Sequence, residues 1–431
     1  MKLIKTTFFS GIITFIKISS GFVAGKVVAL FTGPAGVALI GQFSNFISIV
    51  LAFANGAINS GVIKYTAQYE GDDVKLKKLF STSLKISVYC SGISGIILLL
   101  LSSYASEILF HTDQYKNPIR VLGLTIILYS LNSLLIAILN GLKEIKIYTL
   151  VNTIGSLIGL FFTVLLVFYY RIEGALYALV LTQSIVFFVT LSLVIKSKWF
   201  QWSYFSQSFD KGTALKLSHY SLMTITTALC VPISQIVLRN LLIAKLGIDS
   251  AGYWQGMMRI SDGYLMLVTT SLSTYYLPKL ASLINENELR KEIFQGYRII
   301  MPVVFLSCLI IYFLRYFIIN LLYTKDFVIM NELFLFQLVG DFFKIAAWLL
   351  AFLMMAKSMT KTYILTEVIF SSSYVFFSYI FIKLFNLNGI SVAFAVNYFI
   401  YFIVMLLIFK KLLFKSNQNI NTPIHFKKDA R

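Results

Sequence analysis

The chain has 431 residues, of which 58% are hydrophobic and only 13% charged, and its formal net charge is +19. This composition excludes a soluble globular protein, because apolar runs of about 20 residues, long enough to cross a hydrocarbon core of roughly 30 Å, recur from end to end. We attribute the positive charge to cytoplasmic loops, where Lys and Arg gather in membrane proteins, and exclude nucleic-acid binding.

Apolar segments predict an all-α, polytopic membrane protein with about twelve transmembrane helices. With the N-terminus in the cytoplasm, the cytoplasmic segments and their flanks hold 25 of the 37 Lys and Arg residues, the opposite side holds 7, and 5 lie within spans. This asymmetry predicts that both termini are cytoplasmic. The expected spans are residues 8–31, 36–63, 80–104, 118–140, 147–170, 174–195, 217–245, 250–277, 295–316, 331–356, 362–383 and 389–410.

An aromatic, non-periodic stretch with Trp199 and Trp202 divides these spans into two sets of six. Trp favours the headgroup zone of a bilayer, so we interpret the stretch as an interfacial linker. The predicted parts are an N-terminal six-helix lobe at residues 1–195, a cytoplasmic linker at 196–216, a C-terminal six-helix lobe at 217–410 and a basic cytoplasmic tail at 411–431.

The two predicted lobes show a weak internal similarity. The turn Thr32-Gly-Pro-Ala-Gly36 is echoed near 215 residues later by Gly247-Ile-Asp-Ser-Ala-Gly252. Because each half has an even number of spans, a repeat would relate the halves by an axis along the membrane normal. Chance similarity between two Gly-rich turns is the alternative.

Two lysines interrupt the first predicted span. Lys17 and Lys26 lie in an apolar segment, where a central charge costs about 3 kcal/mol on insertion scales and marks a protein interior or a watery path. They are nine residues apart and so point to opposite sides of a regular helix. Either the helix bends at Gly21 and Gly25, or only one lysine lines the path.

The seventh predicted span carries a cation that favours Lys26 as the path-lining lysine. Matching Gly33 with Gly247 sets Lys26 opposite Asn240, next to Arg239. The first helix of each half would then bring one cation to a similar depth.

Two further predicted helices each carry an amide, a base and an acid at positions i, i+4 and i+7, which share one face of a helix. Lipid cannot satisfy such groups, so we expect both stripes to face a shared polar cleft. The alternative is ion pairing within each helix, of Arg259 with Asp262 and of Asp341 with Lys344. The stripes are Gln255, Arg259 and Asp262 in one helix and Gln337, Asp341 and Lys344 in the other.

The second predicted span has a small, amide-rich stripe at helical spacing. Its members are Asn45, Ser48, Ala52, Asn55 and Asn59. Such a stripe suits hydrogen bonding to a sugar, with Asn55 as the candidate ligand. Hydrogen bonding between neighbouring helices is the alternative.

Positive charges outnumber negative ones inside the predicted spans, which favours an anionic substrate. Arg suits phosphate because its planar fork donates two parallel hydrogen bonds. The carboxylates are candidates for proton coupling or for ion pairs. The cations are Lys17, Lys26, Arg239, Arg259 and Lys344, and the anions are Asp262, Asp341 and Glu367.

Catalytic and cofactor motifs are absent from the sequence. It contains no Walker-type loop, no His-Glu-x-x-His and no Gly-x-Ser-x-Gly. The three cysteines and three histidines are too scattered to predict a disulfide framework or a metal site. We therefore expect a transporter without catalytic residues or cofactors.

Several short motifs occur in order along the chain. They are Ile16-Lys-Ile-Ser-Ser-Gly-Phe-Val-Ala-Gly-Lys26, Phe31-Thr-Gly-Pro-Ala-Gly36, Gly61-Val-Ile-Lys-Tyr-Thr-Ala-Gln-Tyr69, Tyr253-Trp-Gln-Gly256, Ile260-Ser-Asp-Gly-Tyr264 and Gln337-Leu-Val-Gly-Asp341 with Lys344. Together they resemble the Wzx-type flippases of the multidrug, oligosaccharidyl-lipid and polysaccharide exporter superfamily, above all their O-antigen and lipid III branches.

The resemblance implies two six-helix lobes around a central cavity in the bacterial inner membrane. It implies a flippase that carries an undecaprenyl-pyrophosphate-linked oligosaccharide to the periplasmic leaflet by alternating access, with a glycan polymerase and chain-length machinery as partners. It also implies shared residue types at Lys17, Lys26, Arg239, Asp262, Asp341, Lys344 and Glu367, whereas Arg259 departs from the lipid III branch.

Other functions remain as alternatives. A multidrug antiporter of the same superfamily would need an acidic cavity for its cationic drugs, and a lipid II flippase has two more helices. A polytopic glycan polymerase or glycosyltransferase would need a sizeable periplasmic loop, and residues 105–117 are the longest candidate.

Overall fold

The computed structural model describes residues 2–283, 285–357 and 359–414, and every regular element in these ranges is helical. Nine segments of this described part are long and apolar enough to cross a membrane. Two of them, Thr14–Ala54 and Ile145–Ile195, are 41 and 51 residues long, more than one crossing needs. The all-helical membrane fold predicted from the sequence is confirmed.

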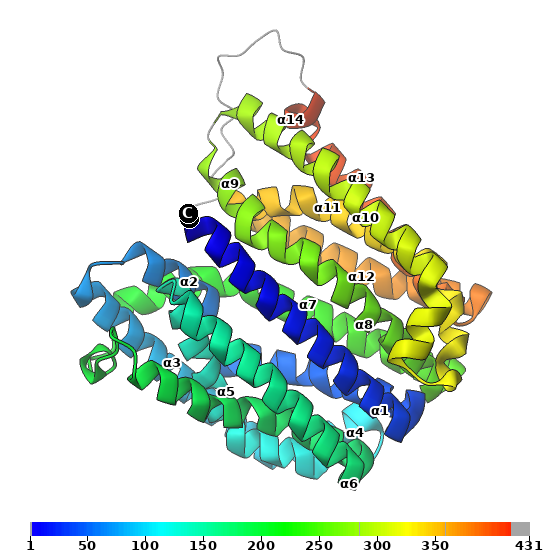
Figure 1. Cartoon of the computed structure of the whole chain (residues 1–431), viewed down its shortest axis with the longest axis horizontal. Helices are drawn as coiled ribbons and strands as arrows, with labels where there is room; N and C mark the ends of the chain where they lie inside the picture. The colour runs from blue at the N-terminus through cyan, green and yellow to red at the C-terminus, as the bar shows by residue number, and fades with distance from the viewer. Residues whose placement is uncertain (1, 284, 358, 415–431) are drawn as a thin grey trace. The chain divides into compact units, whose positions relative to one another are not determined.

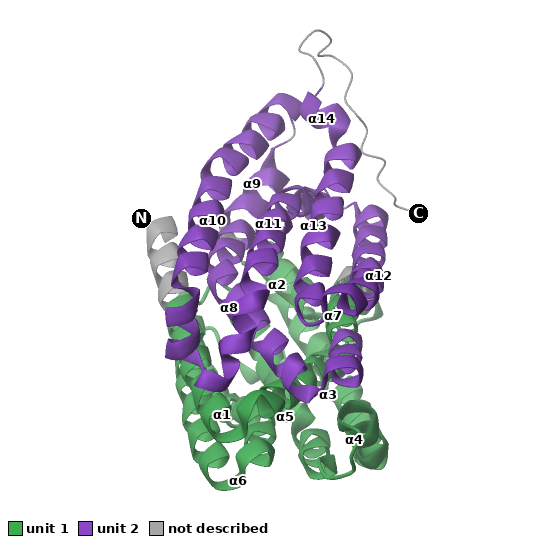
Figure 2. Ribbon diagram, turned by 90° about the vertical axis from the view of Figure 1, so that its right-hand side faces the viewer, with its two compact units in different colours: residues 1–236 green, residues 237–431 purple. Residues whose placement is uncertain are grey.

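The chain forms two compact units, Met1–Ile236 and Val237–Arg431, here called the N-terminal and C-terminal units (Figure 2). The border falls inside α7, whereas the lobe boundaries expected from the sequence flank residues 196–216; that assignment of lobes stays a prediction. Of the expected basic tail, only the residues up to Phe414 lie in the described range.

In the N-terminal unit α3, α5 and α6 pack side by side, and α1 packs on α6 (Figure 1). Apolar side chains of α3 and α5, with Leu217 of α7, enclose one core cluster. The elements are α1 (Lys2–Ala54), α2 (Asn59–Gln68), α3 (Asp73–Leu100), α4 (Ser102–Phe110), α5 (Lys116–Gly141), α6 (Ile145–Ile195), η1 (Trp202–Tyr204) and the first part of α7 (Lys211–Leu246).

In the C-terminal unit α11 packs between α10 and α13, and α12 packs on α13. Leu350, Met354 and Met405 belong to an apolar core cluster of this unit. The elements are the rest of α7, α8 (Ile248–Ser271), η2 (Leu272–Tyr276), α9 (Leu277–Ser282), α10 (Glu286–Leu322), η3 (Lys325–Leu333), α11 (Phe334–Ala356), α12 (Thr360–Phe385), α13 (Asn388–Ile408) and α14 (Lys410–Phe414).

Tight turns with positive φ join pairs of long helical segments in both units. Gly33, with φ 63° and ψ −168°, separates the two parts of α1, and Gly247, with φ 87° and ψ 165°, joins α7 to α8. Only glycine adopts this backbone region at little cost. Arg171 within α6 and Asn386 between α12 and α13 also have positive φ, at 51° and 49°.

These turns support the internal repeat. Gly33 and Gly247 are separated by 214 positions, and Arg171 and Asn386 by 215. The second pair shares a further detail: a side chain on the glycine three residues later would collide with the backbone carbonyl of Leu166 in one unit and of Phe381 in the other. Two matched pairs whose offsets differ by one residue favour a repeat over chance similarity.

The first helix does not bend between its lysines. Inside α1 only Gly33 leaves helical backbone geometry, so of the two alternatives the structure favours a continuous helix at Gly21 and Gly25. Lys17 and Lys26 therefore project to opposite sides of a continuous helix.

The second predicted span ends earlier than the sequence pattern indicates. Its helix stops at Ala54, and Gly56 and Ala57 take positive φ before α2 begins. The expected single stripe through Asn55 and Asn59 is therefore interrupted by a turn.

The aromatic linker lies on α3. The Phe80 ring packs against Trp199, Tyr204 and Phe205, and the Tyr204 hydroxyl donates to Asp73 at 2.7 Å. This hydrogen bond, with burial, raises the pKa of Tyr204 to about 12. The linker is thus fixed to the N-terminal unit by side-chain contacts.

Candidate functional site

Arg239 on α7 is completely buried in the C-terminal unit. Its guanidinium donates to the Gln255 side-chain oxygen on α8 and lies 5.5 Å from the centre of the Trp254 ring. A buried cation needs such partners because its desolvation is costly. The contacts fix α7 against α8 one turn before Arg259.

Asp341 on α11 is also completely buried and is held by hydroxyl donors from α8. The Ser261 hydroxyl lies 2.7 and 2.6 Å from the two carboxylate oxygens, and the Tyr264 hydroxyl donates at 2.7 Å. The Gln337 amide, one turn earlier on α11, is 3.5 Å away. A carboxylate with these donors is satisfied without a cation in direct contact.

Lys344, one turn after Asp341, is enclosed by aromatic rings. Its ammonium lies 5.0 Å from the centre of the Trp348 ring, and 5.9 and 5.8 Å from those of Phe394 and Tyr398 on α13. Its nearest carboxylate oxygen is on Asp262, at 3.9 Å. Cation–π contacts of this kind stabilise a desolvated ammonium.

The ion pairs considered as alternatives within each helix do not form. Among the described residues Lys344 pairs with Asp262 of α8, not with Asp341, and Arg259 pairs with no carboxylate. The Asp262 side chain is 62% exposed. The two stripes therefore meet across helices, because α8 supplies both hydroxyls to Asp341 and the carboxylate to Lys344. A polar cleft shared by the stripes stays a prediction.

Arg259 differs from the other cations on these helices. Its side chain is half-buried, and its Nη1 atom has no hydrogen-bond partner among the described residues. A guanidinium nitrogen that is buried and unpaired can accept a new anionic partner without first breaking a contact.

Glu367 stands apart from this network. It lies on α12, half-buried, and makes no hydrogen bond or ion pair with a described residue. Asp262 contacts Lys344 and Asp341 contacts Ser261, whereas Glu367 contacts neither carboxylate's partners through a hydrogen bond.

The candidate residues of the N-terminal unit do not gather in one network. Lys17 is exposed and Lys26 half-buried on α1. Asn55 is buried and accepts a hydrogen bond from the Ser130 hydroxyl of α5, and Asn59 donates to Ser133 at 2.8 Å. The helix-to-helix alternative for the amide stripe thus describes these two asparagines.

Sequence analysis missed the neutral partners of the buried charges. Ser261 and Tyr264 lie three residues apart on the face of α8 that meets Asp341, and Phe394 and Tyr398 lie four apart on α13. Hydroxyl and aromatic groups at helical spacing are a usable sequence signal for such partners. In the described ranges no three His, Cys, Asp or Glu side chains are placed to hold a metal ion.

The family model described as "Polysaccharide biosynthesis protein" matches residues 27–332. Curated proteins named Lipid III flippase, from Escherichia coli strain K12 and from Shigella flexneri, are each 32% identical over 407 residues. These alignments cover 93% of this chain and 97% of each relative.

Solved structures of transporters share the fold. An inward-facing multidrug resistance MATE family transporter of the MOP superfamily superposes with a TM-score of 0.76 at 15% identity, over 94% of this chain and 96% of that one. A MOP superfamily transporter from Pyrococcus furiosus gives 0.71 at 15% identity, over 95% and 96%.

Proposed function

Since the chain belongs to the polysaccharide biosynthesis protein family and is a homologue of the lipid III flippases, we propose that it translocates a lipid-linked oligosaccharide across a membrane. The single observation that carries this conclusion is the match to the lipid III flippases over 97% of their length. The MOP transporter fold fits alternating access, in which two bundles rock around a substrate site. The protein is a transporter, not an enzyme.

The substrate we propose is an undecaprenyl-pyrophosphate-linked repeat unit of the O-antigen or enterobacterial common antigen type. The membrane is the bacterial inner membrane, with both termini in the cytoplasm, where the excess of Lys and Arg places them. Delivery of the glycan to the periplasmic leaflet would supply a glycan polymerase and its chain-length machinery.

For the pyrophosphate we propose Arg259, Lys26 and Arg239 as ligands. Arg259 has an unpaired, buried nitrogen, and Lys26 is half-buried in an apolar helix. Arg239 would have to exchange its contact with Gln255 for one with phosphate. This exchange suits a change of conformation during transport, and Gln255 would then be released to bind sugar.

The remaining candidates take supporting roles in this proposal. Lys344 would balance a bound anion from its aromatic enclosure, and Asn55 would hydrogen-bond sugar only after giving up Ser130. Lys17 projects to the side of α1 opposite Lys26 and is the weaker ligand.

Proton exchange at a carboxylate is the coupling we propose for the transport cycle. Protonation of Asp341 would remove one of the two negative charges near Lys344 and weaken its hold on Ser261 and Tyr264. Asp262 and Glu367 are the other candidates. Flipping in proteoliposomes that ignores an imposed pH gradient would contradict this coupling.

Deletion in the native host tests the function itself. Mass spectrometry of undecaprenyl-linked glycans should show one repeat unit accumulating in the deletion strain and cleared by the wild-type gene. An unchanged glycan pool, or accumulation of a drug in its place, would overturn the proposal in favour of a multidrug antiporter. Accumulation of lipid II would identify a lipid II flippase.

A further inference from the structure

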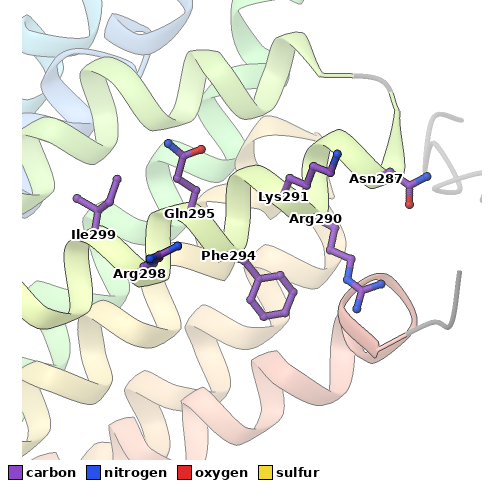
Figure 3. A pocket seen from close by; sticks show the side chains of 7 residues that line it. All are labelled: Asn287, Arg290, Lys291, Phe294, Gln295, Arg298 and Ile299. Carbon is purple, nitrogen blue, oxygen red and sulfur yellow. The ribbon is translucent and has the colours of Figure 1, made fainter.

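A hollow of about 1030 Å³ lies along the first turns of α10 in the C-terminal unit, away from the network of Arg239, Asp341 and Lys344 (Figure 3). Its described lining holds cations, amides and apolar side chains but no carboxylate. In Figure 3 Lys291 and Gln295 project to one side of the helix, Arg290 and Phe294 to the other, and Arg298 lies between them.

The hollow exists because α10 buries only one face here. Leu289, Ile293 and Gly296 recur at helical spacing and are buried, whereas Lys291 and Arg298 lie on the opposite face and are exposed. These two cations are two turns apart, roughly 10 Å along the helix axis, a span that their long side chains can close around one headgroup.

Two of the three cations that line the hollow form no ion pair within the described part of the chain. Neither Lys291 nor Arg298 forms an ion pair or hydrogen bond with any described residue. The third cation, Arg290, lies over the Phe294 ring at 5.8 Å. Phe294 itself is 48% exposed, so an apolar surface borders the cations.

The position along α10 sets the depth of the hollow in a bilayer. Arg298 is the last charged residue before Arg315, and the intervening residues 299–314 are uncharged. Their outward side chains are large and apolar, including Val303, Leu306 and Ile310. An apolar lipid-facing segment that begins at Ile299 places Lys291 and Arg298 among the headgroups, on the side predicted to be cytoplasmic.

We propose that this hollow binds the diphosphate headgroup of a lipid whose hydrocarbon chain stays in the bilayer beside Phe294 and Ile299. Two linked phosphates would supply negative charge to Lys291 and Arg298, which pair with no described residue, and arginine can bind phosphate bidentately. If the proposed function is right, the hollow is the site, here called the station, where the lipid-linked substrate is bound in the cytoplasmic leaflet before it enters the transport path.

Binding of farnesyl diphosphate, a short isoprenyl diphosphate, tests the site in the purified full-length protein. Native mass spectrometry should detect farnesyl diphosphate on the wild type. The double variant K291Q/R298Q should bind it at least about tenfold more weakly, because two charge-assisted hydrogen bonds are lost. The matched control is K325Q, which removes an exposed lysine just beyond the other end of α10 and should bind as the wild type does.

Competition identifies the source of the headgroup. Excess phosphatidylglycerol should displace farnesyl diphosphate poorly, because it has only one phosphate. Excess inorganic pyrophosphate should also displace it poorly, because it has no hydrocarbon chain. Equal displacement by phosphatidylglycerol would make the hollow a general anionic-lipid site, and equal displacement by pyrophosphate a soluble-anion site; either result overturns the proposal, as does undiminished binding by K291Q/R298Q.

Failure of this inference can be told from failure of the proposed function. If the wild type flips a lipid-linked glycan in proteoliposomes and K291Q/R298Q flips it and binds farnesyl diphosphate equally well, the station on α10 is wrong and the function stands. If the double variant loses binding while the wild type flips no such glycan, the diphosphate site stands and the function is wrong.

Discussion

The two units share a backbone plan but bury different chemistry. Among the described side chains, the buried polar residues of the N-terminal unit are all neutral, whereas those of the C-terminal unit include Arg239, Asp341 and Lys344. Counting back 215 positions, the offset of Arg171 and Asn386, Asp341 falls on Ile126 and Lys344 on Tyr129.

The N-terminal unit joins two of its helices, α5 and α6, through a network of neutral side chains. Asn132 of α5 donates to Gln183 at 3.0 Å and accepts from Thr190 at 2.7 Å, both on α6. These bonds join two helices without any charge. In the C-terminal unit the contacts between helices include charged groups, and we propose that these charges also serve transport.

Replacing Arg239 should have the largest effect on transport. It is therefore the strongest test of the difference between the charged C-terminal unit and the neutral N-terminal unit. Arg239→Ala removes the only wholly buried cation in the described chain and leaves the Gln255 oxygen without its donor. We expect transport to fall about 10- to 100-fold, the range that loss of charged hydrogen bonds gives, and Arg239→Lys to restore part of it. Surface-glycan display at matched protein level measures both; wild-type display by Arg239→Ala would contradict a role in transport.

Asp341→Asn should reduce transport about tenfold with less effect on folding. The amide keeps the shape and can still accept from Ser261 or Tyr264, but it removes the charge near Lys344. Flipping in proteoliposomes, with and without a pH gradient, is the measurement. Ser261→Ala is the matched control, since it removes a hydrogen bond and leaves the carboxylate; equal losses in both variants would favour a packing role for Asp341.

Asn132→Ala should act on stability and not on transport. It breaks the bonds to Gln183 and Thr190 in a buried position, so the free energy of unfolding should fall by about 1–3 kcal/mol. Thermal unfolding in detergent gives the stability, and flipping per folded molecule gives the activity. Transport that drops more than the folded fraction would show that the N-terminal network is also functional.

Tyr204→Phe should have the smallest effect, a loss of about 1 kcal/mol from the hydrogen bond to Asp73. Because that bond and burial raise the pKa of Tyr204 to about 12, its contribution should be fully present below pH about 10, the ordinary tyrosine value. It should disappear as the pH rises towards 12. Thermal unfolding of both proteins across this range checks the sign; a difference that grows with pH would contradict it.

The fold follows from local signals in the sequence, and its errors have local causes. Apolar run length predicts the helices, and the positions of Gly33 and Gly247 already indicated a repeat. The pair Asn55-Gly56 is a turn signal for the early end of α1 at Ala54, but the apolar pattern continues through Ala57 and Ile58 and masks it. Helical periodicity alone cannot reveal a turn whose residues fit both states.

The sequence predicts which charged residues belong to the candidate site but not which groups they contact. The stripes of Gln255, Arg259 and Asp262 and of Gln337, Asp341 and Lys344 were found from spacing, because charges in an apolar chain stand out. Which charge faces which depends on the packing of α8 against α11, and the sequence does not contain that register. The pairing of Lys344 with Asp262, in place of Asp341, is a property of the packed helices.

The tight turns at Gly33, Arg171, Gly247 and Asn386 have a consequence for how the chain is made. Almost no residues separate the two helices at each turn. The connection is therefore too short for the first helix to insert fully before the second begins to insert. We expect each pair to be inserted as one hairpin during synthesis. Longer connections join α3 to α5 through α4 and α10 to α11 through η3. These helices can therefore insert one at a time.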